Sequence, residues 1–303
     1  MLYAKTTPAE KRRIFRERLA SGELLQLPGV FNPLSAKLIQ EKGFDGIYIS
    51  GAVLAAELGL PDIGLTTLTE VAARSQQISR MTDLPSLVDA DTGFGEPLNL
   101  ARTVQTLEDA GVSGIHIEDQ VNPKRCGHLD GKAVVDQDTA VKRIASAVDA
   151  RRDENLLIMA RTDIRGVEDL PAAIDRAKRL VDAGADAIFP EAMKDLSEFE
   201  AMRKAIDVPI LANMTEFGKS ELFTKKQLTD IGINIVIYPV SLLRLAMGAA
   251  MRGLDALAQD GNLQAVVPEM QTRAELYELL DYEAYNQFDS GIFNFNLDNH
   301  TKH

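Results

Sequence analysis

The sequence predicts an α/β protein of the (β/α)8 barrel class, with residues 1–303 forming a single barrel domain. Three features predict it: eight short apolar segments, amphipathic helical segments between them, and a repeated kind of junction. The apolar segments are near-continuous rather than alternating, which is typical of parallel strands buried on both faces. The length of 303 residues would also suit two domains, but α/β barrels of roughly 250 residues fold as one.

The predicted strands are spaced regularly along the chain. They cover residues 24–30, 46–50, 86–90, 114–118, 156–160, 187–190, 210–212 and 233–238. Parallel strands need crossover connections of a dozen or more residues, and these are usually helical. Helical spacing of apolar residues predicts such helices over 68–82, 98–110, 139–150 and 170–183.

Two kinds of junction between helix and strand take turns along the chain. Segments 43–47, 111–115, 184–188 and 232–236 each begin with a glycine, which suits the left-handed residue that follows a helix. Segments 83–87 and 207–211 instead place a proline before the strand, where it stops the helix. This repetition favours a closed barrel over a doubly wound sheet. Gly93 and Gly95 lack the third glycine of a dinucleotide-binding fingerprint.

More helix follows the eighth strand than one closing unit needs. Helical patterns cover residues 242–258 and 273–286. We therefore expect the C-terminal segment, from about residue 241 to 303, to pack partly on a partner subunit.

Composition excludes several classes of protein. Asp and Glu number 45 against 33 Lys and Arg, and the net charge of −12 argues against non-specific binding of nucleic acid or anionic membranes. The single cysteine excludes a disulfide framework and a Cys-rich zinc site. No apolar stretch reaches the roughly 18 residues of a membrane span. The charged first residues do not look like a signal peptide, so we expect a cytoplasmic protein.

Polar side chains follow the predicted strands one after another. In a barrel, the active site lies at the carboxyl ends of the strands. The residues found there are Asn32, Ser50, Asp89, Asp91, Glu118, Asp119, Arg161, Asp163, Glu191, Asn213, Thr215 and Glu216. So many polar residues at independently placed strand ends predict one converging site.

Asp89 and Asp91 are the strongest candidates for a metal site. Residues two apart in an extended chain point to the same side, so we expect the two carboxylates to converge. Like charges that close need a cation or a shared proton, and oxygen ligands suit Mg²⁺ or Mn²⁺. Glu118 and Asp62 could orient bound water. The alternative is two solvated loop aspartates, but Gly93 and Gly95 allow a ligand close to the backbone, which favours a site.

Cys126 is the candidate reactive thiol. Lys124, Arg125 and His128 surround it in sequence, and positive neighbours lower the pKa of a thiol. A lone cysteine is more often buried and inert, but these neighbours are too polar for a core. Covalent catalysis by a Cys–His pair is also conceivable, although no acyl-transfer signature accompanies it.

Arginine supplies the candidate carboxylate binders. Arg161 follows a buried strand and can bind a carboxylate through two nitrogens. By themselves, Arg244 and Arg273 look like exposed helix residues. His116 lies inside a predicted strand and is assigned to the core.

These motifs resemble the isocitrate lyase/phosphoenolpyruvate mutase superfamily over essentially the whole chain. The matching runs are 89–95, 116–120 and 124–128, with 28–32, 50–51, 60–62, 161–163 and 213–218 in order. The run 124–128 is typical of the lyase branch, because the phosphonate-forming mutases generally lack its cysteine. The chain is most similar to the lyases of that branch that act on 2-methylisocitrate. Ala52 departs from the pattern, in which a second glycine follows Ser50-Gly51.

The resemblance implies a Mg²⁺-dependent lyase that cleaves a small tricarboxylate, 2-methylisocitrate, to pyruvate and succinate in propionate breakdown. It implies a metal near Asp89 and Asp91, with Asp62 and Glu118 as ligands through water, and Mn²⁺ as a possible substitute. It also implies a swapped C-terminal helix in a homotetramer built as a dimer of dimers. Implied substrate contacts come from Ser50, Gly51, Ala52, Cys126, Gly127, Arg161, Glu191, Asn213, Met214, Thr215, Arg244 and Arg273.

In the implied retro-Claisen cleavage, Cys126 donates a proton to the succinate carbanion. Arg161 and His128 stabilise its charge, and the base is either Tyr48 or a Mg-bound oxygen. Alternatives are a short isocitrate lyase and an oxaloacetate-type decarboxylase or hydrolase, although Cys126 argues against the decarboxylase. A non-catalytic barrel protein would leave the strand ends vacant, and here they are occupied.

Overall fold

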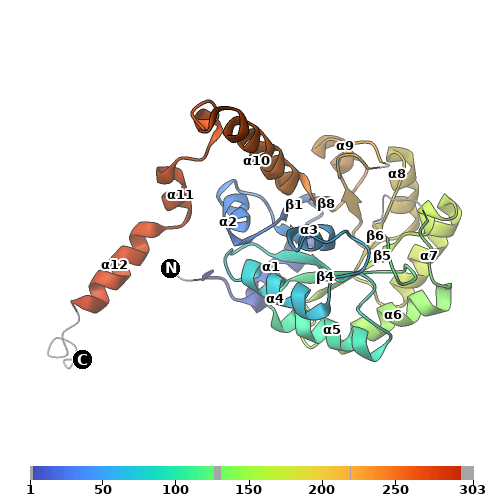
Figure 1. Ribbon diagram of the computed structural model, residues 1–303. Coiled ribbons are helices and arrows are strands. Elements are labelled where there is room, and N and C mark those ends of the chain that lie inside the picture. Colours follow the sequence, from blue (N-terminus) through green and yellow to red (C-terminus); the bar gives the residue numbers. More distant parts are fainter. Residues whose placement is uncertain (1–2, 126–130, 219, 295–303) are drawn as a thin grey trace, which may run out of the picture.

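Eight parallel strands form one sheet in the order β6-β5-β4-β3-β2-β1-β8-β7, as a computed structural model of residues 3–125, 131–218 and 220–294 describes it. A bridge between Ile188 and Ile210 joins the β6 and β7 edges. The sheet thus closes on itself, and helices surround it (Figure 1). The predicted (β/α)8 barrel is confirmed.

The strands occupy the predicted segments with small shifts at their ends. They are β1 Leu25–Val30, β2 Ile47–Ile49, β3 Ser86–Asp89, β4 Gly114–Glu118, β5 Leu157–Thr162, β6 Ala187–Pro190, β7 Leu211–Asn213 and β8 Ile235–Tyr238. β5 runs two residues further than predicted, so Arg161 lies within the strand rather than after it. The shift matters for the site, because Arg161 is thereby held in the ladder opposite Glu118.

The predicted crossover helices are also present. The helices are α1 Pro8–Ala20, α2 Pro33–Glu41, α3 Gly51–Glu57, α4 Leu68–Ser79, α5 Leu98–Asp109, α6 Gln137–Ala150, α7 Leu170–Asp182, α8 Leu196–Ala205, α9 Lys225–Asp230, α10 Ser241–Asp260, α11 Arg273–Leu279 and α12 Tyr282–Phe293. Many begin at a side-chain cap; the Asn32 Oδ1, for example, accepts the Ser35 N–H at 2.8 Å at the start of α2. Asn32 therefore caps a helix instead of joining the polar strand ends at the site.

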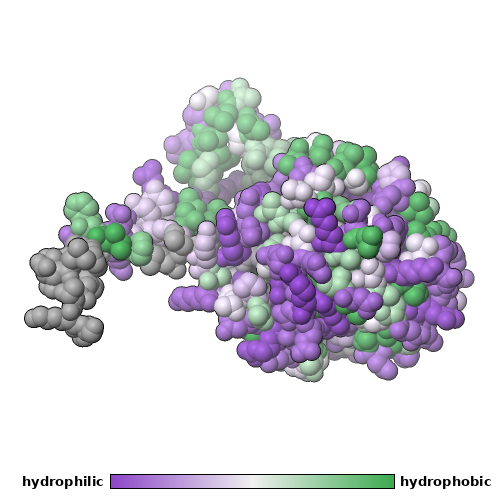
Figure 2. Space-filling model, turned by 90° about the horizontal axis from the view of Figure 1, so that it is seen from below, coloured by the Kyte–Doolittle hydropathy of each residue, from purple (hydrophilic) through white to green (hydrophobic). Residues whose placement is uncertain are grey.

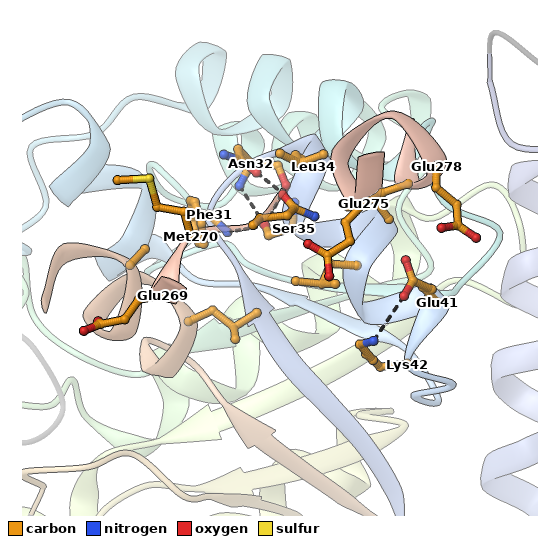
Figure 3. Close-up of a pocket in the computed structure, with 15 residues that line it drawn as sticks. Phe31, Asn32, Leu34, Ser35, Glu41, Lys42, Glu269, Met270, Glu275 and Glu278 are labelled. Atoms are coloured by element: carbon orange, nitrogen blue, oxygen red, sulfur yellow. Dashed lines mark hydrogen bonds and ion pairs between the residues drawn. The ribbon is translucent and has the colours of Figure 1, made fainter. Parts of the chain in front are cut away.

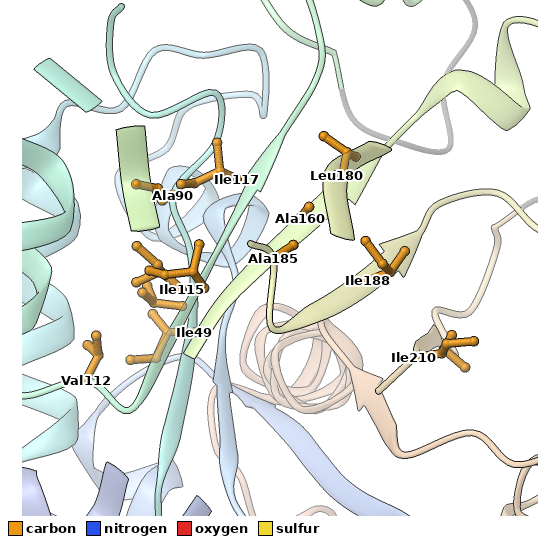
Figure 4. Packing of buried hydrophobic residues seen from close by; sticks show 14 of the residues in the cluster. Ile49, Ala90, Val112, Ile115, Ile117, Ala160, Leu180, Ala185, Ile188 and Ile210 are labelled. Carbon is orange, nitrogen blue, oxygen red and sulfur yellow. The ribbon is translucent and has the colours of Figure 1, made fainter. Parts of the chain in front are cut away.

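Two apolar layers support the strands. Residues such as Ile49, Ile115 and Ile188 point outward and pack under the helices (Figure 4). The inner layer includes Leu87 and Met159, together with Phe15 and Leu19 of α1, Phe15 being fully buried. Because α1 contributes to the inner layer and precedes the first strand, it closes the amino-terminal mouth of the barrel. The interior can then open only at the carboxyl ends of the strands.

The three last helices form an arm that leaves the barrel (Figure 1); we call α10–α12 the C-terminal arm. The helix predicted over 273–286 is wrong as a single element, because Asp281 adopts a left-handed φ of 56° and separates α11 from α12. No residue of the arm helices is buried.

Apolar side chains gather on this arm (Figure 2). On α10, Leu245, Met251 and Leu254 are each more than 60% exposed. Apolar surface of this kind marks an interaction surface. Within the described ranges, no helix is long and apolar enough to cross a bilayer.

Candidate active site

A cavity of about 270 Å³ opens at the carboxyl ends of the strands. Many of its lining residues are those that the sequence predicts for the site, and all of these but Ala52 are polar. They are Tyr48, Ser50, Ala52, Asp62, Asp89, Arg161, Glu191, Asn213, Thr215, Glu216 and Arg244. The predicted convergence of independent strand ends is therefore present.

A larger cavity of about 640 Å³ lies between α2 and the start of the C-terminal arm (Figure 3). Its walls carry Phe31, Leu34 and Met270, with Glu275 and Glu278 from α11. Of the polar strand-end residues predicted for the site, only Asn32 lines it, and Asn32 caps α2. We therefore place the candidate active site in the smaller cavity.

Asp89 and Asp91 converge, but not in the way that the sequence predicts. β3 ends at Asp89, and Asp91 has a left-handed φ of 45°, so the assumption of an extended chain is wrong. A turn brings the two residues together instead: the Asp91 N–H donates to Asp89 Oδ1 at 3.0 Å. The Gly51 N–H donates to Asp89 Oδ2 at 3.2 Å. A Cβ at position 51 would lie 2.9 Å from that same oxygen, so any larger residue there would displace the Asp89 carboxylate.

Lys124 inserts its ammonium group among these acids. Its Nζ lies 2.6 Å from Asp91 Oδ1 and also contacts Asp62 Oδ1, and the side chain is 3% exposed. Burial favours the neutral acid, but nearby positive charge, that of Lys124 and Arg161 included, lowers the pKa of Asp89 to about 2. Burial and the Asp89 charge raise the pKa of Asp91 to about 6, against Lys124. Sequence reasoning assigned Lys124 only to the surroundings of Cys126.

The cluster of carboxylates from Asp62, Asp89, Asp91 and Glu118 fits a divalent cation that keeps much of its water. Both Glu118 carboxylate oxygens are buried and accept no hydrogen bond within the described part of the chain. Over the same residues, no three His, Cys, Asp or Glu side chains form a ready metal cage. Mg²⁺ needs no such cage, because it is usually held by one or two carboxylates and several waters. Asp89 and Asp91 could supply the direct ligands.

Arg161 is the central cation of the cavity wall. Its guanidinium lies 3.0 Å from Asp163, 3.4 Å from Glu118 and 3.3 Å from Glu191. It also stacks over the Phe189 ring at 5.1 Å. Burial alone would lower the pKa of Arg161, but these carboxylates raise it, so the guanidinium stays charged.

Tyr48 and His116 form a buried pair beneath the cavity. The Tyr48 hydroxyl and His116 Nε2 share a hydrogen bond of 2.8 Å, and His116 Nδ1 lies 3.8 Å from Asp89. Burial lowers the pKa of His116 to about 4, so the ring is neutral. The core assignment of His116 is right about burial but misses this contact. One signal was available: His116 and Glu118 are two apart in β4 and face the same side.

Arg244 reaches the rim of the cavity from the start of α10. Its Nη1 lies 2.9 Å from Glu216 Oε2 and also donates to Thr215 Oγ1. Three predicted contacts in the described part of the chain do not line the cavity, and Gly51, whose N–H binds Asp89, is one of them. Met214 is buried, and its sulfur accepts the Phe223 N–H at 3.2 Å. Arg273 is exposed on α11. Cys126, Gly127 and His128 lie outside the described residues.

A family model described as phosphoenolpyruvate phosphomutase matches residues 15–258. The chain belongs to this family. Relatives agree over nearly the full length. A protein of Corynebacterium glutamicum named probable 2-methylisocitrate lyase 2 is 59% identical over 97% of this chain and 95% of its own. The 2-methylisocitrate lyase of Escherichia coli K12 is 44% identical over 93% and 96%.

Solved structures of the family share the fold. Oxaloacetate acetylhydrolase, in complex with 3,3-difluorooxalacetate, matches with a TM-score of 0.89 at 31% identity, covering 96% of this chain and 100% of that one. The 2,3-dimethylmalate lyase, a member of the phosphoenolpyruvate mutase/isocitrate lyase superfamily, gives 0.87 at 32%, over 96% and 99%. Phosphonopyruvate hydrolase, with oxalate and Mg²⁺, gives 0.83 at 29%, over 92% and 98%.

Removing the Arg161 charge should destabilise this family member strongly. Arg161→Met leaves Glu118, Asp163 and Glu191 without a shared counter-ion, and breaking a buried ion pair costs about 3–5 kcal/mol. Urea unfolding should show that loss. The control is Arg13→Met, because Arg13 pairs with Glu17 on the exposed surface of α1, and losing that pair should cost about 1 kcal/mol or less. Equal losses would contradict a central role for Arg161.

Proposed function

We propose that this chain cleaves 2-methylisocitrate to pyruvate and succinate as a carbon–carbon lyase. The observation that carries the proposal is the 59% identity, over 97% of the chain, to a probable 2-methylisocitrate lyase. The cavity supports it, because Arg161 and Arg244 line the same space as the carboxylates of Asp62 and Asp89. The reaction belongs to propionate breakdown through the methylcitrate cycle, and we place it in the cytoplasm, where pyruvate and succinate are used.

The cleavage breaks one carbon–carbon bond and moves one proton at each end of it. The tertiary hydroxyl loses its proton, and its oxygen becomes the keto oxygen of pyruvate. The bonding pair passes to the carbon next to a carboxylate, which gives the aci-carboxylate form of succinate. A proton added to that carbon completes succinate. The site must therefore bind several carboxylates, stabilise extra negative charge and deliver a proton.

Donors on the cavity wall can meet the first two needs. Arg161, Asn213, Thr215 and Arg244 present guanidinium, amide and hydroxyl groups around one space. Asn213 is oriented by Glu191, whose Oε2 accepts from its Nδ2 at 3.4 Å. Donors fixed in advance stabilise developing charge without reorganisation. We assign substrate binding to these residues, with Ser50, Gly51 and Ala52 from the β2–α3 junction.

Asp89 and Asp91 would hold Mg²⁺, or Mn²⁺ in its place, with Asp62 and Glu118 acting through water. When bound, such an ion supplies Lewis-acid stabilisation of negative charge on oxygen. Phosphonopyruvate hydrolase, similar in fold, has been solved with oxalate and Mg²⁺.

Proton transfer is assigned to Cys126 as the donor and Tyr48 as the candidate base. Burial, with the nearby Asp89 charge, raises the pKa of Tyr48 well above its usual value. The phenol is therefore protonated at neutral pH, and it must give its own proton to a neighbour before it can accept one from the substrate. Its hydrogen bond to the neutral His116 offers that neighbour.

Purified enzyme should form pyruvate from 2-methylisocitrate faster than it cleaves isocitrate. The two substrates differ by one methyl group, and a methyl contact changes kcat/KM by roughly 10–200-fold. Oxaloacetate serves as a third substrate, since oxaloacetate acetylhydrolase shares this fold. A higher kcat/KM on isocitrate or oxaloacetate would overturn the proposal and favour a short isocitrate lyase or a hydrolase.

Activity should depend on a divalent cation and on Gly51. Excess EDTA should abolish turnover, and Mg²⁺ should restore it. Gly51→Ala places a Cβ 2.9 Å from Asp89 Oδ2, so we expect Mn²⁺ affinity, followed by electron paramagnetic resonance, to fall about tenfold or more. Gly253→Ala on the arm meets nothing closer than 3.9 Å and should bind the metal normally. Full activity in EDTA contradicts the metal assignment.

Cys126→Ser should lower kcat and spare binding. A hydroxyl is a far weaker acid than a thiol, and general acid–base catalysis contributes roughly 10²–10⁴-fold. Arg161 and Asn213 remain, so KM should change little. Because the chain has one cysteine, iodoacetamide inactivation of the wild type reports on Cys126 alone. Near-native kcat in Cys126→Ser would assign the acid to another group, with His128 first.

The C-terminal arm is proposed to pack on a partner barrel, within a homotetramer arranged as a dimer of dimers. Its support is the exposed apolar face of α10. Sedimentation velocity at micromolar concentration should show an oligomer, and Met251→Glu with Leu254→Glu should shift it towards smaller species. Lys204→Glu, on the surface of α8, is the control. A wild-type monomer would overturn this arrangement.

A further inference from the structure

One buried side chain, that of Gln120, holds the segment that carries Lys124. Gln120 follows β4 by two residues and is 1% exposed. Its Oε1 accepts the backbone N–H of Arg125 at 2.8 Å. Its Nε2 donates to the backbone carbonyl of Arg125 at 2.9 Å. A single amide therefore satisfies both backbone groups of one residue, as a paired strand would.

Gln120 is itself firmly placed. Its backbone carbonyl accepts a hydrogen bond of 2.9 Å from the buried Arg143 of α6. It forms an antiparallel bridge with Val134. Beside that bridge, the Val121 N–H donates to the Ala133 carbonyl at 2.8 Å. The amide that holds Arg125 thus projects from backbone that the barrel and a returning segment both restrain.

Arg125 lies between two residues that the reaction needs. Lys124 precedes it and makes ion pairs with Asp62 and Asp91. Cys126 follows it in sequence. Fixing the N–H and the carbonyl of Arg125 fixes the orientation of both peptide planes that flank it. Gln120 does not line the cavity, so it acts only through this contact.

We infer that Gln120 is a positioning residue for the cleavage, acting through the Arg125 backbone on Lys124 and Cys126. The inference rests on the proposed function, in which Cys126 donates the proton. A general acid must lie within hydrogen-bond reach of its target. A displacement of about 1 Å caused by a distant substitution can cost roughly 10²-fold in rate.

Gln120→Met tests the inference, because it keeps the length of the side chain and removes the amide. We expect kcat for 2-methylisocitrate to fall roughly tenfold to a hundredfold. KM should stay within about threefold, because Arg161, Asn213 and Thr215 are untouched. Gln120→Asn, which keeps an amide but is one methylene shorter, should show the same separation of kcat from KM and serves if the methionine variant does not fold.

Gln40→Met is the matched control. Gln40 Oε1 also accepts a backbone N–H, that of Asp83, at 2.6 Å, but it does so at the opposite end of the barrel. It should leave kcat and KM unchanged. A kcat within twofold of wild type in both Gln120 variants would overturn the positioning role, whatever their melting temperatures.

Hydrogen exchange of the Arg125 amide separates this inference from the proposed function. That amide should exchange at least about tenfold faster in Gln120→Met than in the wild type or in Gln40→Met, since it loses its acceptor. Unchanged exchange would show that the Gln120 amide does not hold the Arg125 backbone. If the wild type fails to cleave 2-methylisocitrate, the proposed function and the positioning role fall together. Exchange still decides whether Gln120 holds Arg125.

Discussion

The structure depends on compensating many carboxylates that are buried at one end of the barrel. Asp89, Asp91, Glu118, Asp163 and Glu191 all lie at the ends of β3 to β6 and are buried. Two like charges 4 Å apart repel by about 4 kcal/mol at an effective dielectric constant of 20. Each cation is therefore shared: Arg161 contacts three of these acids, and Lys124 contacts Asp91 and Asp62. The need to compensate negative charge also connects the metal to the substrate in the proposed reaction. A tricarboxylate that enters an acidic cavity needs more positive charge than Arg161 and Lys124 provide.

The backbone takes uncommon conformations where these acids meet. Asp91 and Phe94 have positive φ, and so do Gly93 and Gly95. A left-handed residue directly after a strand turns the chain back over its own end, so Asp91 can bind the Asp89 carboxylate through its N–H. Such conformations cost about 1–3 kcal/mol and persist only where their surroundings fix them. Here the surroundings are Gly51, which has no Cβ to displace Asp89, and the ladder from β2 to β4.

Regular features of the fold could be predicted from the sequence, and single conformations could not. Continuous apolar runs predicted all eight strands, and helical spacing predicted α4 to α7, because burial on two faces leaves a periodic pattern. The break at Asp281 carries no glycine or proline, so the helix over 273–286 was predicted without interruption. Asp89 and Asp91 do lie together, as the sequence predicts, although the geometry assumed for them was wrong. The insertion of Lys124 between Asp62 and Asp91, the bond from Tyr48 to His116 and the burial of Met214 are tertiary contacts, which spacing does not encode.

The segment between β4 and α6 contacts the barrel through both of its described parts, which we call the first limb (residues 119–125) and the second limb (residues 131–136). On the first limb, Gln120 binds the backbone of Arg125. On the second, Lys132 Nζ lies 2.7 Å from Asp163 Oδ1, and Asp163 also holds Arg161. Asp119 supports this second contact, since it accepts the Asp163 N–H at 2.9 Å and pairs with Arg176 at 3.0 Å. Displacing Lys132 would therefore disturb Arg161, because both side chains pair with the Asp163 carboxylate. The second limb and the carboxylate-binding wall of the cavity thus share one counter-ion. A segment held by such contacts can carry site residues without belonging to a strand, as Lys124 shows by reaching Asp62 and Asp91.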